Sequence, residues 1–150
     1  MLNFIGVDPG GSGGVALISE ARAEAHSLKD VDLYWLSGYL EDLGGRESFA
    51  VIELVHAMPG NGCVSMFNFG VSFGALEAFL IASGIPYVRA TPQRWQKGFG
   101  LYRKADETKT SKKNRHKSLA QELFPDLKIT HATADALLIA EYARRTYDKE

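Results

Sequence analysis

Apolar residues along the chain fall into short runs separated by polar and glycine-rich turns, a pattern typical of an α/β protein. Runs over residues 3–7, 14–19 and 23–27 predict strands, and a Pro-Gly-Gly turn joins the first two as a hairpin. Residues 49–55 predict a buried strand and residues 86–90 a short one. We therefore expect a five-stranded sheet that begins with hairpins.

The remaining apolar positions follow helical spacing. Helices are predicted over 31–43, with a Gly-Gly stop, over 67–83, over 111–124, and from about 132 onward. Thr91 and Pro92 predict a short helical turn, and loops are expected over 56–64 and 98–110. Strands interleaved with helices in this order predict one mixed α/β domain spanning residues 1–150.

Length and cysteine content restrict the class of protein. The chain of 150 residues is long enough to bury one core without disulfides, and Cys63 is its single cysteine. We expect a cytoplasmic protein with no membrane role, because no run approaches the roughly 18 consecutive apolar residues of a membrane span.

Positive charge is concentrated in one segment although the net charge is only -1. This basic segment contains Arg94, Lys97, Arg103, Lys104, Lys109, Lys112, Lys113, Arg115 and Lys117. Such a cluster can follow a phosphate backbone, or it can be a solvated helix with a basic loop. Composition alone does not decide between the two.

The glycine-rich turn after the first strand has three interpretations. Gly11 to Ala16 formally fits a dinucleotide-binding fingerprint, but that motif must lead into a helix and a strand is predicted here. No Gly-Lys-Ser/Thr follows, so a Walker A loop is excluded and no nucleotide cofactor is expected. A tight hairpin without a ligand is the third interpretation. Asp8, directly before the turn, favours a site there because small neighbours allow close approach.

Three carboxylates occur at the ends of predicted elements. Asp8 ends the first strand, Glu53 interrupts the apolar fourth strand, and Asp135 lies in the expected first turn of the last helix. Each alone is explained by a turn, a buried ion pair or a helix start. Together they supply oxygen ligands from separate segments, as two-metal phosphodiester chemistry requires.

Four motifs resemble the RuvC-like Holliday-junction resolvases of the ribonuclease-H-like superfamily, especially the compact phage members. The motifs are I-G-V-D-P-G, V-I-E-L-V-H with A-M-P-G, A-T-P-Q-R-W-Q-K, and A-D-A-L-L-I-A. The resemblance implies a mixed five-stranded sheet flanked by helices, with Asp8, Glu53 and Asp135 holding Mg²⁺ or Mn²⁺, two ions per site. It also implies a homodimeric endonuclease that resolves four-way DNA junctions by hydrolysis in a bacterial or phage-infected cell.

A fourth metal ligand usually precedes the last aspartate of the family by one turn. This sequence has Ala132 there, and His131 is the nearest candidate because it is four residues before Asp135 and can share its helical face. Its alternative is an ordinary histidine near a helix cap. The resemblance also implies a phosphate-stabilising lysine, for which Lys113 is the best match and Lys112 the second.

Residues at the start of the helix predicted over 67–83 and residues of the basic segment are the candidate DNA contacts. They are Met66, Phe67, Arg94, Lys97, Lys104, Lys109, Lys112, Lys113 and Arg115. Phe67, with Met66 and Phe69 beside it, could act as an apolar wedge at the junction centre, although such residues are more often core. Gly70 and Gly74 share a helical face, which favours a dimer interface on this helix.

Two rival functions remain open from the sequence. The first is a junction- or RNA-binding module on the same fold, with a metal site degraded at position 132. The second is a fragment of a sugar-kinase-like ATPase, which also begins with a strand, an aspartate and a glycine-rich hairpin. Such an ATPase needs a second nucleotide-binding half, for which a chain of 150 residues leaves little space.

Overall fold

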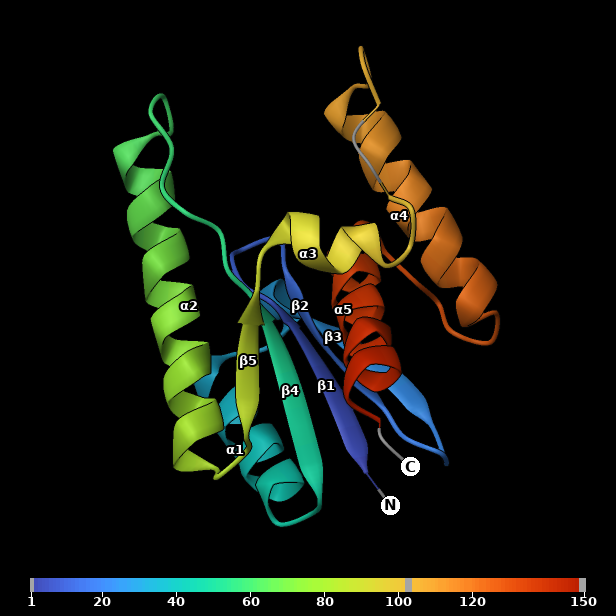
Figure 1. The fold of residues 1–150 in the computed structure, drawn as a ribbon. Helices are drawn as coiled ribbons and strands as arrows, with labels where there is room; N and C mark the ends of the chain where they lie inside the picture. The colour runs from blue at the N-terminus through green and yellow to red at the C-terminus, as the bar shows by residue number, and fades with distance from the viewer. Residues whose placement is uncertain (1, 102–103, 149–150) are drawn as a thin grey trace.

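The computed structural model describes residues 2–101 and 104–148 and consists of one mixed sheet between two helical layers (Figure 1). In chain order the elements are β1 (Asn3–Asp8), β2 (Gly14–Ile18), β3 (Ala23–Ser27), the 3-10 turn η1 (Leu28–Asp30), α1 (Leu33–Gly44), β4 (Ser48–Glu53), α2 (Cys63–Ala82), β5 (Tyr87–Ala90), α3 (Pro92–Lys97), α4 (Lys109–Leu123) and α5 (His131–Tyr147).

The strand order β3-β2-β1-β4-β5 confirms the predicted five-stranded mixed sheet. β1 pairs with β2, and β2 with β3, in antiparallel hairpins. β4 and β5 are added in parallel on the other side of β1. The carboxyl ends of β1, β4 and β5 therefore lie at one edge of the sheet, where ligands of α/β proteins commonly bind.

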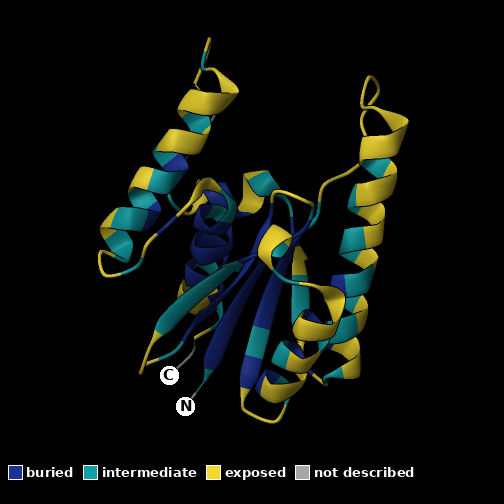
Figure 2. Ribbon diagram, turned by 180° about the vertical axis from the view of Figure 1, so that it is seen from behind, coloured by how far each residue is buried: buried dark blue, intermediate teal, exposed yellow. Residues whose placement is uncertain are grey.

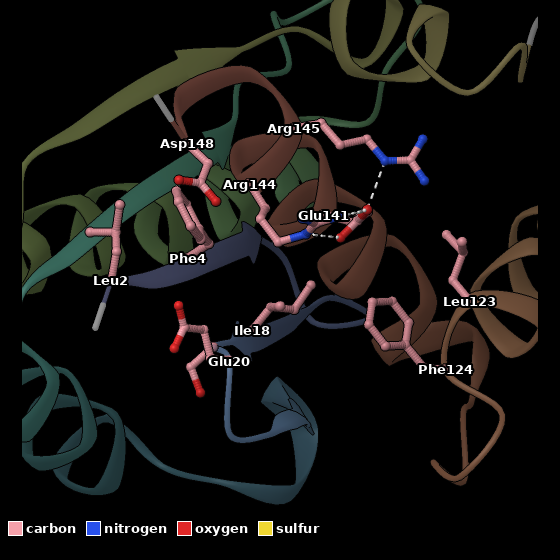
Figure 3. A pocket seen from close by; sticks show the side chains of 11 residues that line it. Leu2, Phe4, Ile18, Glu20, Leu123, Phe124, Glu141, Arg144, Arg145 and Asp148 are labelled. Carbon is pink, nitrogen blue, oxygen red and sulfur yellow. Dashed lines mark hydrogen bonds and ion pairs between the residues drawn. The ribbon is translucent and has the colours of Figure 1, made fainter. Parts of the chain in front are cut away.

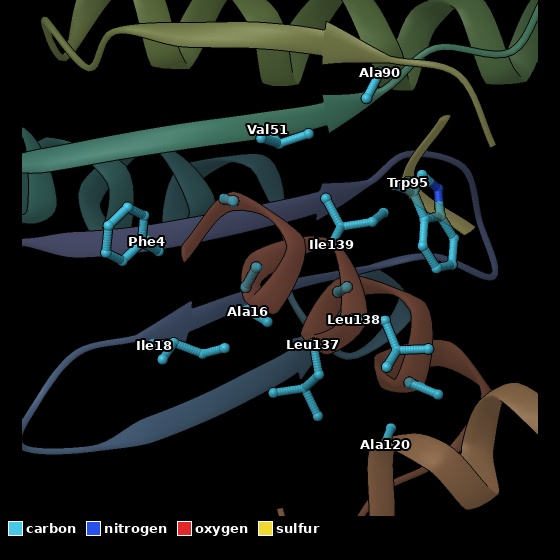
Figure 4. Close-up of a cluster of buried hydrophobic side chains, with 14 of the residues drawn as sticks. Phe4, Ala16, Ile18, Val51, Ala90, Trp95, Ala120, Leu137, Leu138 and Ile139 are labelled. Atoms are coloured by element: carbon cyan, nitrogen blue, oxygen red, sulfur yellow. The ribbon is translucent and has the colours of Figure 1, made fainter. Parts of the chain in front are cut away.

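The two faces of the sheet carry different helices. α1 and α2 cover the face formed by Ile5, Val7, Ala50 and Ile52. α5 covers the opposite face together with α3 and α4, and Figure 4 shows Leu137 toward the strands and Leu138 toward Ala120 of α4. α5 comes unusually close, since a Cβ at Gly6 would lie 2.1 Å from the carbonyl oxygen of Ala136.

Both α2 and α4 extend beyond the carboxyl edge of the sheet (Figure 1). The outer half of α2 is largely exposed (Figure 2). Among the described residues α2 is the one helix long and apolar enough, by length and composition, to cross a membrane, although it contains no uninterrupted run of about 18 apolar residues. Polar residues interrupt the apolar residues of α2 but do not bring its mean hydropathy below that of a membrane span. One such helix is weak support for a membrane role, because helices of soluble proteins pass the same test.

Three helices begin earlier than the sequence pattern predicts. α2 starts at Cys63, α4 at Lys109 and α5 at His131. The caps explain two of these boundaries, because the Thr108 side chain accepts a hydrogen bond from the Ser111 amide and Thr130 forms a capping box with Thr133. Asp135 is consequently beyond the first turn of α5, and a helix-start role for it is wrong.

Candidate active site

Asp8 and Glu53 end neighbouring parallel strands at the same level. Val7 is the partner of Ile52 in the β1–β4 register, so Asp8 and Glu53 follow side by side, on strands about 4.8 Å apart. Val7 and Ile52 face α1 and α2. Because side chains alternate along a strand, both carboxylates face α5.

Asp135 reaches the same place from α5. The helix is held close to the strands by Gly6 and by Gly14, where a Cβ would lie 2.6 Å from the Ala132 carbonyl oxygen. Asp135 and Asp8 line one hollow of about 520 Å³. Asp135 and Glu53 line a second hollow of about 250 Å³. The structure thus brings together the three carboxylates that the sequence singled out.

The electrostatics of this acidic cluster, Asp8, Glu53 and Asp135, are unfavourable for three ionised groups. Burial, then the charges of Glu53 and Asp135, raise the pKa of Asp8 well above its usual range, against the opposing effect of Lys113. Burial raises the pKa of Glu53 to about 7, with Asp135 adding to the shift and the Trp95 hydrogen bond opposing it. A cation would relieve this repulsion.

Two aromatic side chains that sequence reasoning did not assign to the site bind these carboxylates. Trp95 Nε1–H of α3 donates to Glu53 Oε2 at 2.5 Å. His116 Nδ1 of α4 lies 2.7 Å from Asp135 Oδ1. The sequence does contain a signal for His116, since it follows Lys112 and Lys113 at helical spacing and so shares their face.

The turn between β1 and β2 is tightly constrained beside Asp8. Gly10 has a φ of 108°, and its amide donates to Ser72 Oγ of α2 at 3.0 Å. A Cβ at Gly13 would lie 1.9 Å from the Asp8 carbonyl oxygen. Since β2 follows, this turn is a hairpin, as expected, and lacks the helix N-terminus that a dinucleotide fingerprint needs.

His131 lines the 520 Å³ hollow together with Asp8, Lys113 and Asp135. It is exposed at the first position of α5, and its Nε2 lies 2.9 Å from Asn114 Oδ1. His131 therefore lies at the rim of the acidic cluster, bonded to α4 rather than to a carboxylate. Lys113 is also at this rim, close enough to lower the pKa of Asp8.

The predicted apolar wedge residues separate onto different faces of α2. Phe67 is 72% exposed on the outer face of the helix. Phe69 lines the hollow beside Asp8, with its ring against Gly10. Met66 is half-buried, and its Sδ accepts a hydrogen bond from Asn61.

The basic candidates differ in how near they are to the acidic cluster. Lys109, Lys112 and Lys113 of α4 line the 250 Å³ hollow. Arg94 instead contacts the Tyr147 hydroxyl near the other end of α5, and Arg115 pairs with Glu107. Lys97 and Lys104 are exposed. Arg103 lies outside the described residues.

A separate hollow of about 660 Å³ lies at the other end of α5 (Figure 3). Its charged centre is Glu141, which is buried and accepts hydrogen bonds from both Arg144 and Arg145. These bonds satisfy the carboxylate within the chain itself. The other acidic residues that line this hollow, Glu20 and Asp148, are exposed to solvent.

The acidic cluster fits a divalent cation in donor chemistry and charge. Its oxygen ligands are those that Mg²⁺ prefers, and the pKa values of Asp8 and Glu53 are raised first by burial and then by the neighbouring carboxylates, a repulsion that a bound cation would relieve. Within the described residues, no three His, Cys, Asp or Glu side chains converge closely enough to hold one ion. Binding would therefore require the carboxylates to rotate toward the ion.

Comparisons with known proteins identify the fold. No protein-family model and no curated protein matches the chain. The solved structure of T. thermophilus RuvC in complex with Holliday junction substrate matches with a TM-score of 0.62 and 14% identity, covering 98% of this chain and 97% of that one. The Thermus thermophilus RuvC structure matches with a TM-score of 0.61 and 15% identity over 95% of each chain.

The fold is ribonuclease-H-like. The expected fold class is confirmed by the strand order and by the likeness to RuvC structures over nearly the whole chain. At this identity the likeness establishes architecture alone.

Proposed function

We propose that this chain is a divalent-metal-dependent endonuclease of the RuvC type, a single domain over residues 1–150 that resolves four-way DNA junctions. The observation that carries the proposal is the acidic cluster: three carboxylates from β1, β4 and α5 at one edge of a ribonuclease-H-like sheet, two with raised pKa. The related structure bound to a Holliday junction supplies the substrate class.

Asp8, Glu53 and Asp135 would hold Mg²⁺ or Mn²⁺, as two ions per site, and the metal would supply activation of the attacking water and stabilisation of the leaving oxygen. Lys113 offsets negative charge that develops on the phosphate, because it already interacts with Asp8. His131, at the rim, orients water or adds a nitrogen ligand that suits Mn²⁺ better than Mg²⁺. Lys109 and Lys112 attract the DNA backbone toward the cluster.

The apolar outer face of α2 supports a homodimer. This α2 stripe consists of Val64, Phe67, Val71, Gly74, Ala78 and Ile81, all exposed. The spacing of its members follows one face of the helix. A Cβ at Gly70 or Gly74 would meet nothing within 4 Å, so a helix of a second subunit could pack closely against the backbone at these positions. A two-fold dimer places two equivalent sites on a junction, which has the same approximate symmetry.

Cleavage assays test the catalytic part of the proposal. A four-way junction, a fork and a linear duplex are compared with Mg²⁺, with Mn²⁺ and with EDTA. We expect paired nicks in the junction, with metal only. Binding of the junction without nicking under every metal condition would favour the alternative, a catalytically weakened junction- or RNA-binding module.

Sedimentation tests the dimer with a matched pair of variants. Val71, 54% exposed on the α2 stripe, and Leu33, 53% exposed on α1, are each replaced by arginine. Val71→Arg is expected to give monomers at micromolar concentration, whereas Leu33→Arg stays dimeric. Wild-type protein that is monomeric at these concentrations would contradict the interface.

The setting of the protein is also a proposal. A nuclease of this class acts on DNA in the cytoplasm of a bacterial or phage-infected cell. The likeness to RuvC covers both chains almost fully, which supports a role in DNA recombination or repair.

A further inference from the structure

Trp95 links α3 to the end of β4. It is the largest fully buried side chain of the described residues, and its only polar atom donates to Glu53 Oε2. The indole therefore holds one oxygen of Glu53 from the side of α3. Figure 4 shows Trp95 at the edge of the α5 core, near the end of the neighbouring strands.

His116 makes the equivalent contact with Asp135. It is 3% exposed, and its Nδ1 lies 2.7 Å from Asp135 Oδ1. An ionised carboxylate can only accept, so Nδ1 is the donor of this bond whenever Asp135 is ionised, as it is when it holds a metal. One oxygen of Asp135 is thus engaged by α4, as one oxygen of Glu53 is engaged by α3.

The two rings also contact one another. Trp95 and His116 meet edge to face, with ring centroids 5.7 Å apart and planes at 72°. This geometry is favourable for aromatic pairs. Glu53, Trp95, His116 and Asp135 consequently form a continuous chain of contacts from β4 through α3 and α4 to α5.

We propose that Trp95 and His116 form an aromatic bracket that sets the separation and orientation of Glu53 and Asp135. They are positioning residues, since each acts through a carboxylate. The proposal rests on the metal-binding role given to those carboxylates above. Loss of a partner that holds a metal ligand in place typically weakens metal affinity by about 10- to 100-fold.

The energetic cost of burying His116 argues against a role in packing alone. Within the described residues, its buried Nε2 has no hydrogen-bond partner. An unsatisfied buried nitrogen is destabilising, and a phenylalanine would fill similar space without that cost. The hydrogen bond between Nδ1 and Asp135 explains why this position is occupied by a histidine.

Metal affinity, measured without DNA, tests the bracket. Mn²⁺ binding is followed by calorimetry and electron paramagnetic resonance in wild type, Trp95→Phe, His116→Phe and His116→Asn. We expect about tenfold weaker binding in both phenylalanine variants. His116→Asn should restore most of the affinity, because its Nδ2–H can take the place of Nδ1–H.

Ile139→Val is the matched control, since Ile139 is fully buried in the same core but contacts neither carboxylate through a polar atom. Its Mn²⁺ affinity should equal that of wild type even if its stability falls as much as that of the test variants. Wild-type affinity in both Trp95→Phe and His116→Phe would overturn the bracket.

A metal-independent signal separates this proposal from the proposed function. The Trp95 indole N–H resonance, distinguished from that of Trp35 by Trp95→Phe, should shift in His116→Phe if the rings are coupled. If wild-type protein binds no Mn²⁺ and His116→Phe still shifts the Trp95 resonance, the proposed function is contradicted and the bracket is supported. Absence of the shift would overturn the bracket, whatever the metal result.

Discussion

α5 carries a carboxylate toward each of its ends, and the surroundings of the two differ. Near its end, Glu141 is buried, which raises its pKa, but hydrogen bonds from Arg144 and Arg145 more than compensate and the pKa is lowered. Near its start, Asp135 joins Asp8 and Glu53, whose pKa values are raised. The charge of Glu141 is neutralised by arginines of its own helix, whereas the acidic cluster has no arginine partner of this kind among the described residues.

This difference separates a structural carboxylate from a candidate ligand. Buried charges persist in proteins when they are paired or bound to metal. Glu141 has its partners one turn away on the same helix. The acidic cluster draws its members from three elements. The Trp95 hydrogen bond and the charges of Lys112, Lys113 and His116 oppose the rise in pKa of Asp8 or Glu53 without cancelling it. A cation from solution would complete it.

Asp8→Asn should give the largest effect of all. It removes a metal ligand while keeping size and hydrogen bonding, so nicking of a four-way junction should fall by about 10³-fold or more, which is the several kcal/mol a metal supplies. Junction binding by gel shift should persist. Glu141→Gln is the matched control at the other end of α5 and should nick normally. Retained cleavage in Asp8→Asn would contradict the metal site.

The pH dependence of stability should have opposite signs for the two clusters. In metal-free protein, Glu53 keeps its proton to about pH 7, while the unfolded chain loses it near 4.5. The free energy of unfolding therefore falls as pH rises between these values, by up to about 3 kcal/mol. Glu141, with a lowered pKa, instead stabilises above its usual pKa and loses this contribution as pH falls.

Urea titrations at a series of pH values measure these slopes. Glu53→Gln should flatten the decline between pH 4.5 and 7, and saturating Mn²⁺ should reduce it, because a bound cation favours the ionised carboxylate. A wild-type stability that rises through this window would mean that the acidic cluster is already neutralised by the chain.

Sequence patterns predicted the sheet because its signals are local. Alternation, glycine turns and caps set the strands within a residue or two, and Asp8 and Glu53 stood out as charges within apolar strands. The bracket could not be predicted in this way, because Trp95 and His116 meet the carboxylates only through packing of α3 and α4. The exposed face of α2 was equally hidden, since a buried helix would have the same composition.

Glu141→Gln should cost about 2 kcal/mol of stability through weakened charged hydrogen bonds. Urea unfolding at pH 7 measures this loss. Asp42→Asn is the control, because Asp42 forms an exposed i,i+4 pair with Arg46 and such pairs contribute about 0.3–0.5 kcal/mol. Equal effects of the two changes would show that burial of Glu141 does not strengthen its pairing, and the contrast between the ends of α5 would lose its basis.

His131→Ala gives the smallest expected effect and decides how complete the acidic cluster is. His131 is exposed and bonded to Asn114, so it contributes from the rim, and we expect nicking with Mn²⁺ to fall about tenfold with junction binding unchanged. Asn114→Ala removes the same hydrogen bond but keeps the imidazole, so it should lose less activity. If both variants cut like wild type, His131 is an ordinary cap-region histidine and the three carboxylates must hold the metal by themselves.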